Sequence, residues 1–168
     1  MVNKETMRVL PLHCLYRDNN PGSVQIDSDV LSSMIEQLSQ NSETEQGGFL
    51  GMDAQGVIRG FWYDWDAQRD ATGYQPSSEC LTEAIGKWRL EGMSFTGIIH
   101  THNSAMPKLS RSDLVYTQRL LECNPNIKRL IMGMLVEGRV QMYLFERDFI
   151  PWLSRKLQHN EPLHRSQM

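Results

Sequence analysis

The sequence predicts a single-domain α/β protein, and three observations support that prediction. The chain has 168 residues, which suits one domain with a substantial hydrophobic core. Hydrophobic residues make up 40% of it and charged residues 22%, as in ordinary globular proteins. Segments with helical and strand-like patterns of apolar residues alternate along the chain, without repeats or low-complexity tracts.

The first half of the chain predicts two strands, a helix and a β-hairpin. The helix has N-cap candidates at Asp27, Ser28 and Asp29, followed by apolar residues at helical spacing. The hairpin contains a Gly47-Gly48 pair, which weakens a strand unless another backbone or a ligand approaches closely. The predicted elements are an irregular strand over 7–16 broken at Pro11, a turn at 19–22, a short strand at 24–26, a helix to about residue 40, and hairpin strands over 45–51 and 57–62.

The second half continues this alternation of helices and strands. Ser77 and Ser78 are N-cap candidates for a second helix, which Gly92 ends, and the apolar run over 95–100 is typical of a buried central strand. The other predicted elements are an irregular polar segment over 64–76, a third helix over 110–122, a hairpin with strands over 127–136 and 139–145, and a C-terminal helix over 147–158. We therefore assign the domain to residues 1–158 and a polar tail to residues 159–168.

Charge and composition exclude several classes of function. The net charge is −3, so the chain lacks the basic surplus that is typical of nucleic-acid-binding proteins. No apolar run approaches the roughly 20 residues that cross a bilayer, and the first residues do not resemble a signal peptide. The sequence predicts a cytoplasmic protein without a nucleic-acid or membrane partner. The three cysteines are widely spaced and predict reduced thiols.

Two histidines at the end of the predicted central strand carry candidate chemistry. His100 and His102 are two positions apart, so in a strand both side chains project from one face, and Thr101 points the other way. Imidazoles suit zinc, and Asp113 supplies an oxygen ligand if the third helix begins beside the strand end. Three protein ligands leave one position for water, which is typical of a catalytic zinc site.

Each part of this pattern also has a simpler explanation. Two histidines at alternate positions are commonly ordinary strand-end or surface residues. Ser110 and Asp113 are three residues apart at a predicted helix start, where they form an acceptable capping box. The combination of both parts, at a strand end and a helix start, is far more specific than either part alone.

This combination, together with a glutamate upstream, resembles a known family. The residues concerned are His100-Thr101-His102, then after seven residues Ser110-x-x-Asp113, and upstream Glu45-x-x-Gly48-x-Leu50. They match the motif H-[ST]-H-x7-S-x-x-D and the E-x-x-G-x-L segment of the JAMM (also called MPN+ or JAB) zinc metalloproteases. The resemblance covers about residues 28–145. It implies the cytidine-deaminase-like MPN/JAB fold, in which helices flank a mixed, curved β-sheet.

The resemblance also implies a role for each matched residue. His100, His102 and Asp113 would hold one zinc ion per chain. Glu45 would accept a proton from water and later deliver it to the leaving amine. Ser110 would hydrogen-bond the developing oxyanion. Taken alone, the glutamate reads as a solvated residue before a strand, and only its pairing with the downstream motif changes that reading.

Several further residues are candidates for substrate binding. In the family pattern proline often follows the second histidine, where this chain has Asn103. Glycine often occupies the position of Met52. The loop path and the substrate fit are therefore expected to differ from those of the family. The expected substrate contacts are Gly47, Gly48, Trp65, Tyr74 and Asn103. The aromatic cluster Trp62-Tyr63-Trp65 either packs in the core or forms a substrate-facing wall. We expect residues 64–76 to become ordered against an extended substrate tail by adding a strand to an edge.

The function that the resemblance implies is a zinc-dependent isopeptidase or peptidase that cleaves after the C-terminal Gly of a ubiquitin-like modifier. Such an enzyme removes the modifier from its targets or matures its precursor. The chain is similar to stand-alone bacterial JAB peptidases encoded in ubiquitin-like conjugation systems, including antiphage operons with an activating and a conjugating enzyme. The alternatives are a peptidase for sulfur-carrier protein adducts and a non-catalytic MPN scaffold. The sequence names neither the modifier nor its target, nor does it choose between peptide and isopeptide bonds.

Overall fold

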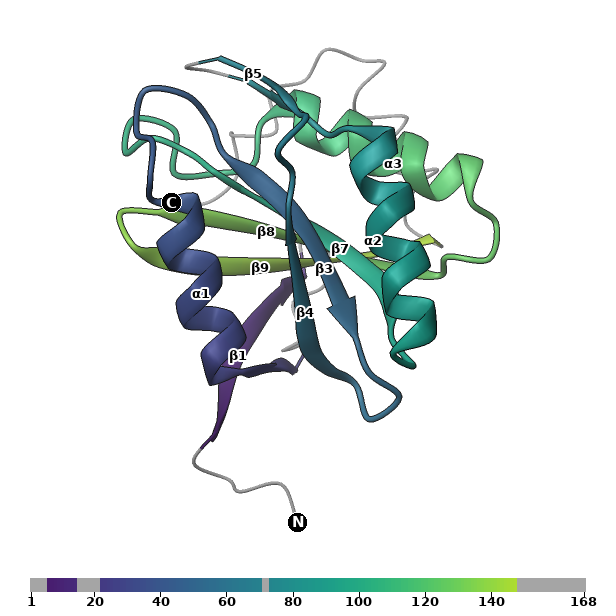
Figure 1. Cartoon of the computed structure of the whole chain (residues 1–168). Helices are drawn as coiled ribbons and strands as arrows, with labels where there is room; N and C mark the ends of the chain where they lie inside the picture. Colours follow the sequence, from purple (N-terminus) through teal and green to yellow (C-terminus); the bar gives the residue numbers. More distant parts are fainter. Residues whose placement is uncertain (1–5, 15–21, 71–72, 148–168) are drawn as a thin grey trace.

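The computed structural model describes residues 6–14, 22–70 and 73–147. Seven strands form the main sheet: β1 (Met7–Cys14), β2 (Ser23–Asp27), β3 (Gly47–Met52), β4 (Val57–Tyr63), β7 (Ser94–Thr101), β8 (Arg129–Val136) and β9 (Arg139–Glu146). A separate two-stranded sheet consists of β5 (Gln68–Arg69) and β6 (Tyr74–Gln75). The described residues also form three α-helices: α1 (Ser28–Leu38), α2 (Ser78–Leu90) and α3 (Arg111–Cys123). Figure 1 shows their arrangement.

The main sheet closes into a barrel, and this corrects the predicted fold class. The strand order is β1-β2-β4-β3-β7-β8-β9, with β9 pairing back onto β1. The predicted MPN/JAB fold, with helices flanking a curved sheet, is therefore wrong for a described region that is mostly sheet with three helices. The closure depends on β1, which pairs with β2 as far as Pro11 and with β9 from Leu12 onward.

The path of β1 also explains why the predicted break at Pro11 is wrong. The strand runs without interruption from Met7 to Cys14. Proline has no backbone N–H to donate, and it lies here at the point where the strand exchanges one partner for the other. A residue that disrupts most strands is therefore tolerated at this position.

The central strands of the barrel are buried on both faces. Phe49 and Leu50 are neighbours in β3, yet they belong to different hydrophobic clusters, and Ile98 and Ile99 of β7 divide in the same way. This division follows from the two-residue period of side chains in a strand. One cluster includes residues of α1, the other includes residues of α2 and α3, and the helices lie on opposite sides of these strands (Figure 1).

All three helices begin at the predicted N-caps. Asp27 caps α1, Ser77 caps α2 and Ser110 caps α3, and each side-chain oxygen accepts a hydrogen bond from a backbone N–H of the first turn. Gly92, with a φ of +74°, follows the end of α2 in the left-handed conformation that glycine adopts without strain. Capping is a local interaction, so the sequence alone was sufficient to predict it.

Three predictions fall outside the described residues: the turn at 19–22 except Gly22, the C-terminal helix over 147–158 beyond its first residue, and the polar tail over 159–168.

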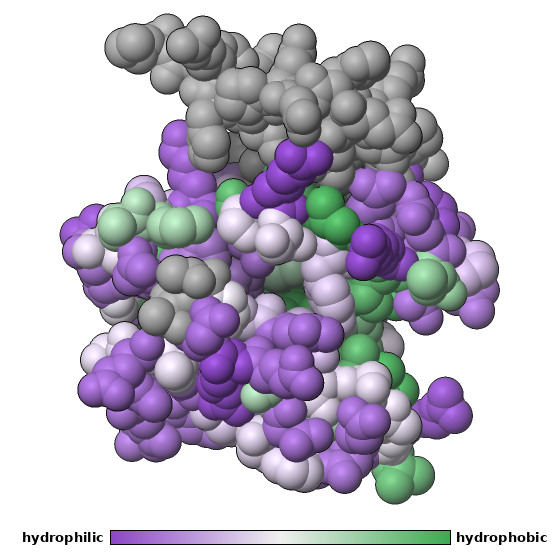
Figure 2. Space-filling view, turned by 90° about the horizontal axis from the view of Figure 1, so that it is seen from above, coloured by the Kyte–Doolittle hydropathy of each residue, from purple (hydrophilic) through white to green (hydrophobic). Residues whose placement is uncertain are grey.

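Within the described part, Cys80 is a buried free thiol and Cys123 an exposed one, as predicted. No helix of this part is long and apolar enough to cross a membrane. Seen from above, the molecule has mostly hydrophilic residues around a hollow in which hydrophobic atoms are visible (Figure 2).

Asp53 holds the turn of the hairpin formed by β3 and β4. Its Oδ1 accepts hydrogen bonds from the N–H groups of Gln55 and Val57, both at 2.9 Å. Its Oδ2 accepts a hydrogen bond from Nε of Arg59 at 2.5 Å. Burial opposes the charged form, but these bonds outweigh it and lower the pKa of the Asp53 carboxyl.

Replacing Asp53 with alanine is expected to lower the free energy of unfolding by about 1–2 kcal/mol at pH 7, because three hydrogen bonds to a charged acceptor are lost. The pKa of this carboxyl is lower in the folded state, so its contribution is complete above the unfolded value of about 3.9 and is lost as the pH falls through the folded value. Urea unfolding of both proteins at several pH values checks this. A stability difference that does not shrink on acidification would contradict the prediction.

Candidate metal centre

His100 and His102 lie together at the end of the central strand β7. His100 pairs with Gly47 of β3 on one side and with Met134 of β8 on the other, so it lies within the sheet. Both histidines are buried, with exposed fractions of 1% and 7%. Their Nε2 atoms are 2.8 Å apart. The predicted convergence of the two imidazoles on one point is therefore present in the structure.

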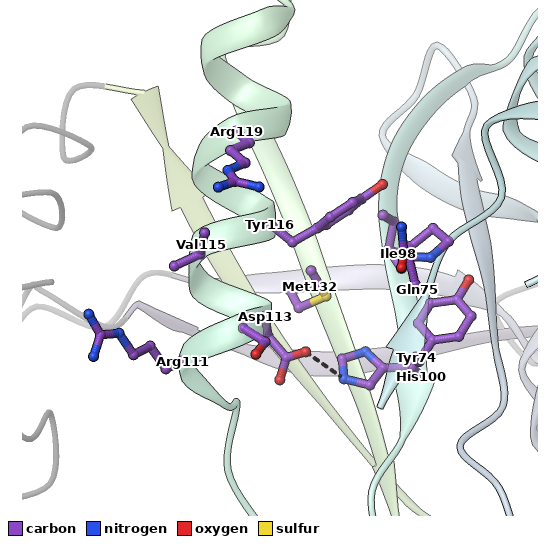
Figure 3. Close-up of a pocket in the computed structure, with 12 residues that line it drawn as sticks. Tyr74, Gln75, Ile98, His100, Arg111, Asp113, Val115, Tyr116, Arg119 and Met132 are labelled. Atoms are coloured by element: carbon purple, nitrogen blue, oxygen red, sulfur yellow. Dashed lines mark ion pairs between the residues drawn. The ribbon is translucent and has the colours of Figure 1, made fainter. Parts of the chain in front are cut away.

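Asp113 reaches the same point from the first turn of α3. Its Oδ1 is 3.1 Å from Nε2 of His100, and its Oδ2 is 3.4 Å from Nε2 of His102 (Figure 3 draws the contact with His100). Burial opposes the charged form, but hydrogen bonds from the two histidines hold the pKa of Asp113 well below its usual range. The carboxylate is therefore ionised, as a metal ligand must be.

Glu45, which lies two residues before the start of β3, completes the group. A carboxylate oxygen of Glu45 and one ring nitrogen of each histidine lie within 4.8 Å of one another. Glu45 has an exposed fraction of 8%, and its backbone N–H donates to the carbonyl of Asp70 over 2.8 Å. Burial raises the pKa of the Glu45 carboxyl, the two histidines oppose this rise, and the nearby carboxylates of Asp113 and Asp70 reinforce it.

This donor set fits a divalent metal ion. Nδ1 of His102 lies 2.9 Å from the carbonyl oxygen of Met106, which can only accept, so Nδ1 carries a proton. Metal binding would displace the Nε2 proton that faces Asp113 and leave Nε2 to coordinate. Two nitrogens on a tetrahedral zinc ion are about 3.3 Å apart, given bonds of about 2.0–2.1 Å. The two Nε2 atoms therefore need to separate by only about 0.5 Å to accept an ion. The group of Glu45, His100 and His102 could thus hold a metal ion.

Ser110 lies next to Asp113 and caps α3. Its Oγ accepts a hydrogen bond from the N–H of Asp113 over 3.1 Å, and its own N–H donates to Oδ2 of Asp113 over 2.6 Å. This is the capping box that the sequence predicted. The cap uses the hydroxyl oxygen as an acceptor and leaves the hydroxyl proton available, so the cap is compatible with a donor role toward substrate.

Thr101 connects the glutamate to the histidines, a connection that the motif does not reveal. Its Oγ1 accepts a hydrogen bond from the N–H of Gln46 over 2.8 Å, and its N–H donates to the carbonyl of Gln46 over 2.8 Å. Thr101 lies between the two histidines and Gln46 follows Glu45, so these bonds fix the distance between Glu45 and the histidines. The alternation of a strand already predicted that this side chain points away from the histidines.

Replacing Thr101 with valine is expected to keep the side-chain shape but leave the buried N–H of Gln46 unpaired, at a cost of about 1–3 kcal/mol in stability. Glu45 then loses a bond that holds its neighbour Gln46, whereas the histidines keep their contacts, so we expect the metal content to stay the same. Thr101→Ser retains the hydroxyl and is the control. Metal analysis and urea unfolding of both variants check this, and equal behaviour of the two would contradict the role of the hydroxyl.

The structure gives several predicted substrate residues a contact within the protein. The space in front of Gly47 is filled by the ring of Tyr74, and the space in front of Gly48 by Phe61 and a backbone carbonyl. Asn103 accepts a hydrogen bond from the N–H two residues later, so its side chain holds a turn. The three aromatic residues of the predicted cluster separate: Trp62 and Tyr63 are partly buried against the core, and Trp65 is 60% exposed.

A cavity of about 490 Å³ opens beside the metal centre. His100 and Asp113 line one end of it, and α3 forms one wall, with Tyr116 reaching across it (Figure 3). Tyr74 belongs to the opposite wall, which comes from β6 and from Pro76, the residue that follows it. A substrate in this cavity lies in contact with two of the candidate ligands.

Comparisons with known proteins bear on the fold alone. No family model matches the chain, and no curated protein matches it. Among solved structures 84 chains are similar to it, and one of them is the solution structure of protein DSY2949 from Desulfitobacterium hafniense. That structure superposes with a TM-score of 0.56 at 17% sequence identity, and the match covers 73% of this chain and 84% of the other. The two chains therefore share a fold.

Proposed function

We propose that this protein is a zinc-dependent peptidase or isopeptidase of the JAMM type, which cleaves after the C-terminal Gly of a ubiquitin-like protein. The observation that carries the proposal is the convergence of separate segments on one buried point. The Nε2 atoms of His100 and His102 are 2.8 Å apart there, and each lies within 3.4 Å of one of the two carboxylate oxygens of Asp113. Glu45 lies against the two histidines.

Zinc is the metal we propose, because imidazole and carboxylate ligands with one open position are the set that catalytic zinc prefers. When bound, zinc polarises a carbonyl group and lowers the pKa of water to about 7. Among transition metals the same ligands also accept others, so metal analysis of the purified protein decides the identity. One ion per chain is expected.

The residues around the metal divide the remaining work. The carboxylate of Glu45 accepts a proton from water and later delivers it to the nitrogen of the leaving amine. Burial raises its pKa, which brings a carboxylate closer to the range in which it both accepts and releases a proton. The hydroxyl of Ser110 donates a hydrogen bond to the oxyanion, since its oxygen alone is used by the cap.

The proposed substrate is a ubiquitin-like protein or its conjugate, whose narrow, extended tail suits a confined site. An activating or conjugating enzyme encoded beside this chain would place it in a conjugation pathway, such as an antiphage system. A cytoplasmic location is the corresponding expectation from the sequence. The proposal includes neither a nucleic-acid nor a membrane partner.

The proposal is tested by metal content and cleavage together. The purified full-length chain is expected to contain about one zinc per chain. It is offered a panel of ubiquitin-like proteins, each extended by a short peptide beyond its C-terminal Gly. Cleavage should stop after chelation and return with added zinc. Less than half a zinc per chain, or cleavage that survives chelation, would contradict the proposal.

A further inference from the structure

Tyr74 lies nearly parallel to the imidazole of His100. The two ring centroids are 5.6 Å apart, and the ring planes differ by only 15° (Figure 3). Tyr74 belongs to β6 and His100 to β7, so this contact joins the small two-stranded sheet to the barrel. At this spacing the rings are in the range of offset stacking, which is attractive and depends on orientation.

The hydroxyl end of Tyr74 is anchored to a buried carboxylate. The hydroxyl donates a hydrogen bond to Oδ2 of Asp64 over 2.9 Å, and the N–H of Ser77 donates to the same atom over 2.9 Å. Asp64 is completely buried, and its own N–H donates to the carbonyl of Gly47. Burial and the Asp64 carboxylate raise the pKa of Tyr74 well above its usual value, so the phenol keeps its proton and remains a donor.

Gly47 leaves the space that the tyrosine ring occupies. A Cβ placed on Gly47 would lie 2.3–2.7 Å from three carbons of the Tyr74 ring, which is too close for any real contact. Gly47 is also the residue of β3 that pairs with His100 of β7. The glycine is therefore needed because the ring lies directly over the backbone at this point.

The two histidines of the metal centre are oriented by different contacts. Nδ1 of His102 is held by the carbonyl of Met106 at 2.9 Å. Nδ1 of His100 is buried and has no hydrogen-bond partner among the described residues. Histidines that bind metals usually owe their orientation to such a bond at the second ring nitrogen. His100 has no such hydrogen bond among the described residues. The stacked ring of Tyr74 is therefore a contact that restricts the rotation of the His100 imidazole.

We infer that Tyr74 is a positioning residue, which holds the imidazole of His100 in the orientation that metal binding requires. The inference rests on the proposed metal site and adds a residue outside its motif. A phenol that donates to a carboxylate has an electron-rich ring, and an imidazole bound to a cation has an electron-poor one. Their stacking therefore strengthens when the metal binds. The anchor on Asp64 keeps the tyrosine in place for this contact.

The inference is tested by the zinc affinity of the full-length protein, which is measured by competition with a chromophoric chelator. The absorption spectrum of the Co²⁺-loaded protein is the second readout. Tyr74→Leu is expected to weaken zinc binding about 10- to 100-fold, which is the usual cost of losing a partner that orients a metal-binding histidine. It is also expected to alter the Co²⁺ spectrum. Tyr74→Phe keeps the ring and loses the anchor, so its effect should be smaller. Tyr116→Leu removes another tyrosine of the same cavity and should change affinity by less than about twofold.

Gly47→Ala provides an independent test, because it displaces the ring without removing it. We expect this variant to weaken zinc binding as well. In the Tyr74→Leu background the same change should have little further effect, since the ring that it displaces is already gone. Full additivity of the two changes would overturn the inference. So would a Tyr74→Leu protein with the zinc affinity and Co²⁺ spectrum of the wild type.

These outcomes distinguish the inference from the proposed function. A wild-type protein that binds no zinc contradicts the proposed function itself. If the wild type binds zinc and cleaves its substrate, and Tyr74→Leu binds zinc equally well, only the inference fails. If Tyr74→Leu does not fold, the Tyr74→Phe and Gly47→Ala variants decide, because neither removes the aromatic ring from the protein.

Discussion

Glu45→Ala is expected to lose catalysis while it keeps the metal. The variant removes the carboxylate that we propose exchanges protons with water and with the leaving amine, so turnover should fall by roughly 10²- to 10⁴-fold. The proposed ligands His100, His102 and Asp113 are unchanged, with each Nε2 atom within 3.4 Å of one carboxylate oxygen, so zinc should stay at about one ion per chain. Single-turnover cleavage and metal analysis of the same sample measure both quantities.

Glu43→Ala is the matched control for this prediction. Glu43 lies two residues earlier and is exposed, whereas Glu45 is buried beside the histidines. The control should retain the wild-type turnover, because its carboxylate is directed to solvent rather than to the site. Full turnover by Glu45→Ala would refute the assigned base. Loss of zinc from that variant would instead make Glu45 a ligand.

His100→Ala is expected to lose both the metal and the activity. The variant removes one of three proposed ligands, a residue of exposed fraction 1%, and leaves Asp113 without one of its two histidine partners. Zinc at about 100 times its dissociation constant stabilises the wild type by about 2.7 kcal/mol, which raises Tm by roughly 5–10 °C for a chain of this size. The variant should show no such shift with added zinc in differential scanning calorimetry.

His13→Ala controls for the loss of a histidine as such. His13 is exposed in β1, where its ring lies 5.8 Å from that of Tyr143, and it is not part of the metal centre. This variant should retain the zinc-dependent rise in Tm. If His100→Ala kept the same rise, the ion would have to bind elsewhere, and the metal centre would be assigned incorrectly.

Local features of the sequence were sufficient to predict a large part of the fold. The helix starts at Asp27, Ser77 and Ser110 follow from side-chain capping, which involves only residues two or three positions apart. The central strand and both hairpins follow from apolar patterns and turn residues. The closed barrel was not predicted, because it depends on pairing between strands from opposite ends of the chain, for which no local pattern exists.

The residues of the candidate site divide in the same way. The spacing of His100 and His102 places both on one face of a strand, and the capping box places Asp113 in the first turn of a helix. These are consequences of backbone geometry, so the sequence by itself determined them. The resemblance of these residues to a protease motif then supplied Glu45 as their partner.

The tertiary structure alone decided how these local pieces meet and what supports them. The antiparallel pairing of β3 with β7 brings Glu45 to the histidines, and the bonds between Thr101 and Gln46 hold it there. The same packing places Tyr74 on His100, a contact that no sequence spacing predicts. The physical reason is that capping and strand periodicity act within a few residues, whereas strand pairing and ring stacking depend on how the whole chain closes.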